Sequence, residues 1–123
     1  MLKRRVMPTM LLRGHGLVKG ERYQSWRYVG SVLQAARVYE ARHVDEMVLL
    51  DIAATPHERG PDVATIADVA ADCFMPLTVG GGVRTLSDFA SLWRAGADKG
   101  VVCTAALERP GLITEAAERL GSQ

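Results

Sequence analysis

Residues 76–89 read PLTVGGGVRTLSDF, in which a short apolar run and three glycines precede a helix-like pattern. The run 76–79 predicts a strand. Thr85 with Asp88 three residues later forms a capping-box pattern, which predicts a helix over 85–96. Each glycine costs backbone entropy on folding, so three glycines between a strand and a helix need a physical reason.

Two reasons fit these glycines. Main-chain N–H groups without a Cβ in front of them, backed by the positive end of a helix, form an anion cradle best suited to phosphate. A tight turn that needs positive φ would use glycine as well. Because G-x-G-x-x-G spacing is absent, the spacing leaves both explanations open.

The same alternation of strand and helix extends through the chain and predicts one α/β domain over residues 1–123. Strand–helix alternation with right-handed crossovers gives a parallel sheet covered by helices. The unbroken apolar run at 46–52 predicts burial on both faces of that sheet. The expected strands are 5–12, 46–52, 76–79 and 99–104, and the expected helices are 31–43 capped by Ser31, 61–73 with Pro61 in its first turn, 85–96 closed by Gly96, and one after Pro110-Gly111.

Two further features concern the organisation of the chain. Segment 13–30 contains four glycines and is expected to be a long loop, of the kind that is functional or mobile. Segments 44–53 and 97–106 share an Asp and a Val at matching positions, a weak internal echo. The echo places Asp51 and Thr104 at equivalent strand ends.

Composition excludes several classes of protein. The net charge of +1 gives no field that points to nucleic acid or an anionic membrane. No stretch approaches the ~20 apolar residues of a membrane span, and the N-terminus does not resemble a signal peptide. The two cysteines, Cys73 and Cys103, are expected to be free thiols in a reducing cytoplasm. The three histidines are scattered, so neither a metal nor a cofactor is expected.

Function in parallel α/β folds collects at the carboxyl ends of the strands. Those ends offer Gly80, Gly81 and Gly82, the Thr104 hydroxyl, and the N–H groups of the next helix from Ala105 onward. Together they would form a phosphate site.

Other candidates at these ends have competing explanations. Asp51 would bind a substrate hydroxyl or transfer a proton, or it is a turn carboxylate. Lys19 and Arg84 would each close on an anion, or each is solvated. Cys103 is expected to be a small buried filler rather than a nucleophile, because no His–Asp pair is placed to activate it.

Several motifs in order carry a family resemblance: LVKG, MVLLDIAAT, PLTVGGGVRTLSDF, GADKGVV and TAALERPGLITEAAERLGSQ. They resemble the cyclase subunit of imidazole glycerol phosphate synthase from Met1 to Gln123. That family is a (β/α)₈ barrel of about 250 residues. The chain resembles its N-terminal half, which implies a (βα)₄ half-barrel with four parallel strands and helices on the outer face.

The resemblance implies a role in histidine biosynthesis. The full enzyme takes ammonia from a glutaminase partner and closes an imidazole ring on a substrate with a phosphate at each end. Gly82 and Thr104 match its first-half phosphate site. Lys19 matches a mobile-loop lysine, and Asp51 matches a carboxylate that faces the substrate.

The resemblance also assigns residues at the opposite end of the barrel. Arg5, Glu46 and Lys99 match a charged ring at the barrel floor, which is the ammonia entrance. The fourth member of that ring lies in the half that this chain does not match. Asp98 matches the face that meets the glutaminase.

The chain departs from the family at its chemistry. The family needs an aspartate at the ends of strands one and five, but Leu11 holds the first position and cannot transfer a proton. Cys103 stands where the family often has Asn. We therefore expect weak or absent cyclase activity. The segment MLLRGHGLVKG is closer to a cyclase-like partner of amidotransferases in surface-sugar biosynthesis, an alternative for the ancestry.

A half-barrel exposes two sheet edges and an apolar inner face, and both features favour association. Strand four of one copy could pair with strand one of another, closing an eight-stranded barrel about a two-fold axis. We therefore expect a homodimer or higher homo-oligomer that binds a phosphate or a bisphosphorylated molecule. The alternatives are a piece of a longer enzyme, a subunit that pairs with a separate second half, and an assembly module without catalysis.

Overall fold

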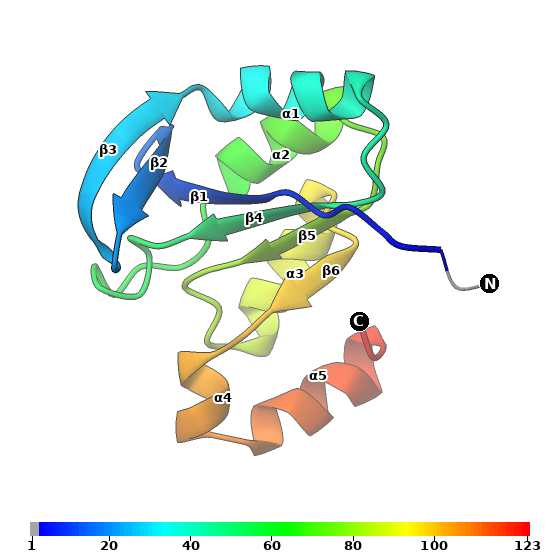
Figure 1. Cartoon of the computed structure of the whole chain (residues 1–123). Helices are drawn as coiled ribbons and strands as arrows, with labels where there is room; N and C mark the ends of the chain where they lie inside the picture. Colours follow the sequence, from blue (N-terminus) through cyan, green and yellow to red (C-terminus); the bar gives the residue numbers. More distant parts are fainter. Residues whose placement is uncertain (1–2) are drawn as a thin grey trace.

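The computed structural model describes residues 3–123, which form helices and a six-stranded sheet in the order β3-β2-β1-β4-β5-β6 (Figure 1). Strands β1, β4, β5 and β6 are mutually parallel, which confirms the predicted alternation. The sheet is open rather than closed, consistent with a half-barrel. The strands are β1 (Thr9–Arg13), β2 (Gly16–Glu21), β3 (Gln24–Gly30), β4 (Met47–Asp51), β5 (Leu77–Gly80) and β6 (Lys99–Val101), and the helices are α1 (Val32–Ala41), α2 (Val63–Asp72), α3 (Leu86–Ala95), α4 (Thr104–Glu108) and α5 (Gly111–Leu120).

The predicted loop at 13–30 is wrong, because this segment forms the antiparallel hairpin β2–β3. Leu17 and Val18 of β2 are buried, and β2 pairs with β1 from Leu11 to Arg13. The hairpin turns through Arg22 and Tyr23, which both have positive φ although neither is glycine. Pairing with β2 also leaves only the part of β1 before Leu11 free along that edge.

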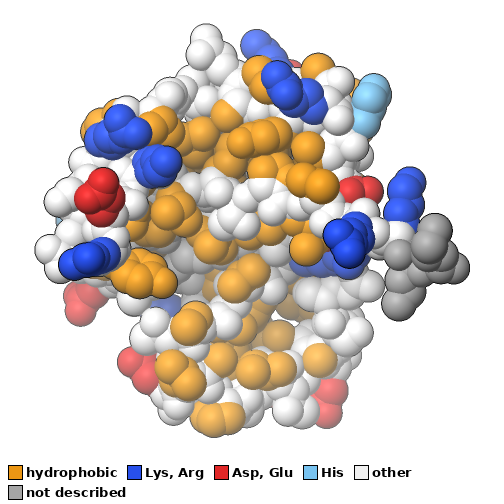
Figure 2. Space-filling view, in the orientation of Figure 1, with side chains coloured by type: hydrophobic (Ala, Val, Ile, Leu, Met, Phe, Trp, Pro, Cys, Tyr) orange, Lys and Arg blue, Asp and Glu red, His pale blue; other side chains and the backbone are white. Residues whose placement is uncertain are grey.

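The two faces of the parallel strands differ in burial. Met47 and Leu49 of β4 are fully buried against the helices, whereas Val48 and Leu50, which alternate with them, are half-buried. The prediction of burial on both faces therefore holds for one face only. In Figure 1, α2 and α3 lie behind the sheet, and Figure 2 shows hydrophobic side chains gathered on the opposite, open face.

Helix ends follow the sequence in part. The predicted capping box of Thr85 and Asp88 is present, and Gly96 ends α3 in the left-handed conformation. Ser31 occupies the N-cap of α1 but its side chain makes no capping bond. Pro61 lies before α2 rather than in its first turn, because the Asp62 carboxylate caps that helix. The helix predicted after Pro110-Gly111 is present as α5, and the short helix α4 before Pro110 was not predicted.

The sequence echo has a structural counterpart at the amino end of the sheet. The Asp45 carboxylate accepts a bond of 2.6 Å from the Val6 N–H, and the Asp45 N–H donates to the Val6 carbonyl at 3.1 Å. Asp98 repeats this two-way pairing with Leu77, at 2.8 Å in both directions. Each aspartate thus ties the start of its own strand to the start of the neighbouring parallel strand.

No helix within residues 3–123 is long and apolar enough to span a lipid bilayer.

Candidate functional site

A cavity of about 450 Å³ opens at the carboxyl end of the sheet, between the glycine loop after β5 and the segment after β6. Gly81, Gly82, Thr104 and Ala105 all line it, so two segments that are distant in sequence meet there. Gly80 lies within β5 and is not among the lining residues. The structure therefore brings together four of the five residues predicted for a phosphate site.

Packing explains why glycine occupies this loop. Gly81 has φ of 104°, and a Cβ on it would lie 2.2 Å from the Asp51 carbonyl oxygen. Gly82 has φ of 73°, and its Cβ would lie 2.5 Å from the Arg59 carbonyl oxygen. Both positions therefore exclude a side chain by conformation and by contact. This requirement exists without any ligand, so support for an anion must come from the cavity itself.

Main-chain N–H groups and one hydroxyl give the cavity its donors. Thr104 and Ala105 open α4, and N–H groups in the first turn of a helix have no intrahelical acceptor. The Thr104 residue is exposed, so its hydroxyl is accessible. Cys103 precedes them as the N-cap residue and lines the same cavity. The prediction that Cys103 is buried is wrong, because the residue is exposed.

Charged side chains surround these donors. Arg84 lines the cavity and donates from Nη2 to the Glu58 carbonyl at 2.9 Å. Glu58 and Glu108 line it too. Sequence reasoning did not identify these two acids, since no pattern links them to the glycine loop. They oppose an anion electrostatically, so binding would depend on the main-chain donors and Arg84.

Asp51 ends β4 on the face that packs against the helices. Its side chain is only 5% exposed, its Oδ1 accepts a bond of 3.0 Å from the Ala53 N–H, and its Oδ2 lies 2.7 Å from Nη2 of Arg59. The contact with Arg59 is an ion pair, and Oδ2 accepts no hydrogen bond within residues 3–123. Asp51 is not among the residues that line the cavity. Its contact with a substrate stays a prediction.

The three residues predicted for the barrel floor lie together at the amino end of the sheet. Lys99 Nζ lies 2.9 Å and 3.1 Å from the two carboxylate oxygens of buried Glu46, and Arg5 Nη1 contacts the same carboxylate. The Lys99 hydrogen bond, aided by the charges of Lys99 and Arg5, lowers the pKa of Glu46 below its ordinary value although burial opposes this. Glu46 is thus held as a carboxylate between two cations.

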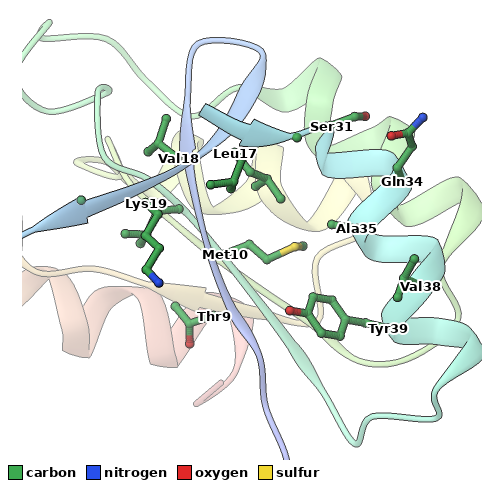
Figure 3. Close-up of a pocket in the computed structure, with 14 residues that line it drawn as sticks. Thr9, Met10, Leu17, Val18, Lys19, Ser31, Gln34, Ala35, Val38 and Tyr39 are labelled. Atoms are coloured by element: carbon green, nitrogen blue, oxygen red, sulfur yellow. The ribbon is translucent and has the colours of Figure 1, made fainter. Parts of the chain in front are cut away.

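Lys19 lies apart from both groups. It lines a second cavity, of about 560 Å³, between the hairpin, β1 and α1. Figure 3 shows its amine extending toward Thr9, while Tyr39 reaches in from α1 toward Met10. Lys19 is not among the residues around Gly82 and Thr104. Its predicted closure over an anion would require the hairpin to move.

Comparison with known proteins shows the family of this chain. A family model described as histidine biosynthesis protein matches residues 5–123. This chain belongs to the histidine biosynthesis protein family. The resemblance predicted from the motifs is therefore confirmed.

The relatives of this family member include imidazole glycerol phosphate synthase subunit HisF of Dictyoglomus thermophilum, which is 43% identical over all of this chain and 49% of its own length. The HisF subunit of an Exiguobacterium species is 44% identical over 48% of its length. A putative imidazole glycerol phosphate synthase subunit hisF2 of Campylobacter jejuni is 42% identical over 49% of its length. The chain spans about half the length of the curated relatives it matches, and it is similar to the N-terminal half of HisF.

Proposed function

We propose that the chain is a phosphate-binding half-barrel of the histidine biosynthesis protein family. The observation that carries this proposal is the single cavity shared by Gly81, Gly82, Thr104 and Ala105. Residues from two segments line it, and their main-chain N–H groups would donate to phosphate oxygens, which accept such bonds well at the carboxyl ends of parallel strands. A small molecule with two phosphates would use one such site in each half of a closed barrel.

Calorimetric titration with inorganic phosphate tests this site. We expect saturable binding to the wild-type chain. Thr104→Val, which keeps the shape and removes the hydroxyl, should weaken binding about tenfold, the value of one hydrogen bond to a charged group. Thr114→Val on exposed α5 is the matched control, because Thr114 does not line the cavity. Equal affinity in the wild type and Thr104→Val would remove Thr104 from the site, and no binding by the wild type would defeat the proposal.

We also propose that the chain has weak or absent cyclase activity. Leu11 lies at the centre of β1, two residues before its end, with Leu50 and Val18 as its neighbours in the sheet register, so the position is apolar. An apolar side chain cannot act as a general acid or base. An ammonia-dependent cyclase assay of the purified chain should therefore show no substantial turnover. Substantial turnover would contradict this part of the proposal.

Association with a second copy would cover the open face. That face carries half-buried Leu50 and Val101 in adjacent register positions around Gly80. β6 forms one edge of the sheet, and Thr9 and Met10 of β1 pair with β4 but not with β2. Pairing of β6 with this part of β1 in a second copy would close the barrel about a two-fold axis.

Sedimentation equilibrium tests the association. We expect a mass of twice 13.4 kDa at micromolar concentration, and a monomer at all concentrations would contradict it. Leu50→Lys should shift the chain toward monomer, because it places a charge on the open face.

The floor of the closed barrel would be surrounded by Lys99, Glu46 and Arg5. We propose that these residues control ammonia entry there, and that Asp98 lies on the face that would meet a glutaminase.

A further inference from the structure

The loop that follows β4 forms the support on which the glycine loop rests. The Asp51 carbonyl oxygen would be 2.2 Å from a Cβ on Gly81, and the Arg59 carbonyl oxygen would be 2.5 Å from a Cβ on Gly82. The carbonyl carbon of Gly60 would be 3.1 Å from that same Gly82 Cβ. Main chain therefore packs on main chain at these contacts, together with the Ala54 Cβ, which would be 2.7 Å from that same Gly82 Cβ.

Main-chain bonds and two arginines hold this supporting loop in shape, one of them being Arg84, whose Nη2 donates to the Glu58 carbonyl at 2.9 Å. The Arg59 N–H donates to the Ala54 carbonyl at 3.0 Å, and the Glu58 N–H donates to the Thr55 carbonyl at 3.0 Å. Glu58 adopts φ of 52°, an unfavourable conformation for a residue with a side chain. The Arg59 guanidinium provides the link across the loop, since it pairs with the buried Asp51 carboxylate at the end of β4.

We propose that Arg59 is a positioning residue for the anion site, acting through Asp51 and the loop between them. Its ion pair fixes the Asp51 and Arg59 carbonyls, and these carbonyls set where Gly81 and Gly82 lie. The inference rests on the proposed phosphate site and adds a residue that does not itself line the cavity. Arg59 is partly exposed at 38% and Asp51 is buried, so the pair anchors a surface loop to the sheet.

The physical reason is the state of Asp51 without its partner. Its Oδ2 is buried and has no hydrogen-bond partner within residues 3–123, so Arg59 supplies its nearest positive charge. A buried carboxylate that loses its cation is strongly disfavoured. The loop would then move to let Oδ2 reach water, and the tight contacts under Gly82 would move with it.

The test compares Arg59→Gln with Arg59→Lys, and uses Arg37→Gln as the matched control. Arg37 pairs with Asp72 on the exposed side of α1 and α2, remote in the fold from the cavity. Two measurements are made on the full chain: amide chemical shifts of Gly81 and Gly82 without ligand, and the affinity for inorganic phosphate. We expect Arg59→Gln to shift both amides and to weaken phosphate binding about tenfold, as expected when one charge-assisted hydrogen bond is misplaced.

Arg59→Lys keeps the positive charge and should recover part of the affinity and part of the shifts. Arg37→Gln should change neither measurement. If Arg59→Gln does not fold, Asp51→Asn gives the same comparison, because Asn can still accept the Ala53 N–H while the ion pair is lost. Unchanged Gly81 and Gly82 shifts in the folded variant overturn the inference. Absence of phosphate binding by the wild type would defeat the proposed function instead. In that case the amide chemical shifts of Gly81 and Gly82 without ligand would still test the positioning role of Arg59.

Discussion

At the amino end of the sheet, Glu46 lies between Arg5 and Lys99, and the Asp98 carboxylate accepts a hydrogen bond from the Leu77 N–H. At the carboxyl end, Thr104 and Ala105 present donors to a cavity. The two ends thus use polar groups in opposite ways. Charged groups at the amino end, which we call the floor, pair with one another within the chain, whereas we propose that donors at the carboxyl end, which we call the rim, bind an anion.

We therefore expect the two ends of the sheet to affect different properties of the chain, stability at the amino end and phosphate binding at the carboxyl end. Changes at the floor should alter the free energy of unfolding and leave phosphate affinity unchanged. Changes at the rim should alter phosphate affinity. Beneath the glycine loop, where main chain packs on main chain, changes should also alter the free energy of unfolding. The glycine loop is therefore where the two roles meet, and its variants should have the largest effects.

Gly81→Ala should be the most damaging substitution. Its Cβ would lie 2.2 Å from a carbonyl oxygen at φ of 104°, so either the backbone strain or the contact must be relieved by moving the loop. We expect a loss of about 3 kcal/mol or more in the free energy of unfolding. Gly111→Ala is the control, because nothing lies within 4 Å of its Cβ position and its φ is not positive. Denaturant unfolding of both variants decides, and equal stabilities would contradict the packing account.

Asp98→Ala should lower the free energy of unfolding by roughly 1 kcal/mol, because the Leu77 N–H loses its charged acceptor at a partly exposed site. Phosphate affinity should not change. Asp68→Ala on exposed α2 is the control, since Asp68 makes no side-chain bond within the described residues. A marked loss of phosphate affinity in Asp98→Ala would contradict the prediction that changes at the floor leave phosphate affinity unchanged.

Glu46 predicts a specific pH dependence. Its folded pKa is lowered from 4.5, so its stabilising effect is complete above that pH and is lost as the pH falls through the lowered value. The stability difference between wild type and Glu46→Gln should therefore shrink as the pH drops below 4.5. Unfolding curves at a series of pH values, with Glu118→Gln on α5 to subtract the general effect of neutralising one acid, measure it. A stability difference between wild type and Glu46→Gln that grows as the pH falls would contradict this prediction.

The smallest effect concerns the acids around the cavity. Glu108→Gln removes one negative charge from the lining and should strengthen phosphate binding about two- to threefold at low salt. The gain should fade as salt is added. Titrations at two ionic strengths measure both effects, and weaker binding by Glu108→Gln would mean that the anion does not enter this cavity.

Much of the fold was predictable because local signals and tertiary packing agree. The capping box at Thr85 and the parallel strand order follow from residue types at fixed spacing. The Asp45 and Asp98 echo predicted two equivalent units, and their matching bonds to Val6 and Leu77 give that echo a cause.

The hairpin could not be found in the same way. Its turn uses Arg22 and Tyr23 at positive φ, where Asn-Gly or Asp-Gly would have marked a hairpin. Leu17 and Val18 are buried in the assembled sheet, where β2 pairs with β1, and no pattern within 13–30 alone predicts that burial.

The candidate site was predictable in its residues but not in its supports. Gly81, Gly82, Thr104 and Ala105 follow from the rule that carboxyl strand ends converge, and they do meet. Arg59 escaped prediction because its role depends on a loop conformation with a positive φ at Glu58. Asp51 carried no signal for which face it occupies, since the apolar run around it predicted burial on both.

The most direct test is a titration of the labelled chain with inorganic phosphate, followed by amide chemical shifts. The account predicts that the Gly82 and Ala105 amides shift together with one dissociation constant, while the Leu77 amide at the floor does not move. Shifts that appear at the floor and not at Gly82 and Ala105, or no saturable shifts at all, would contradict it.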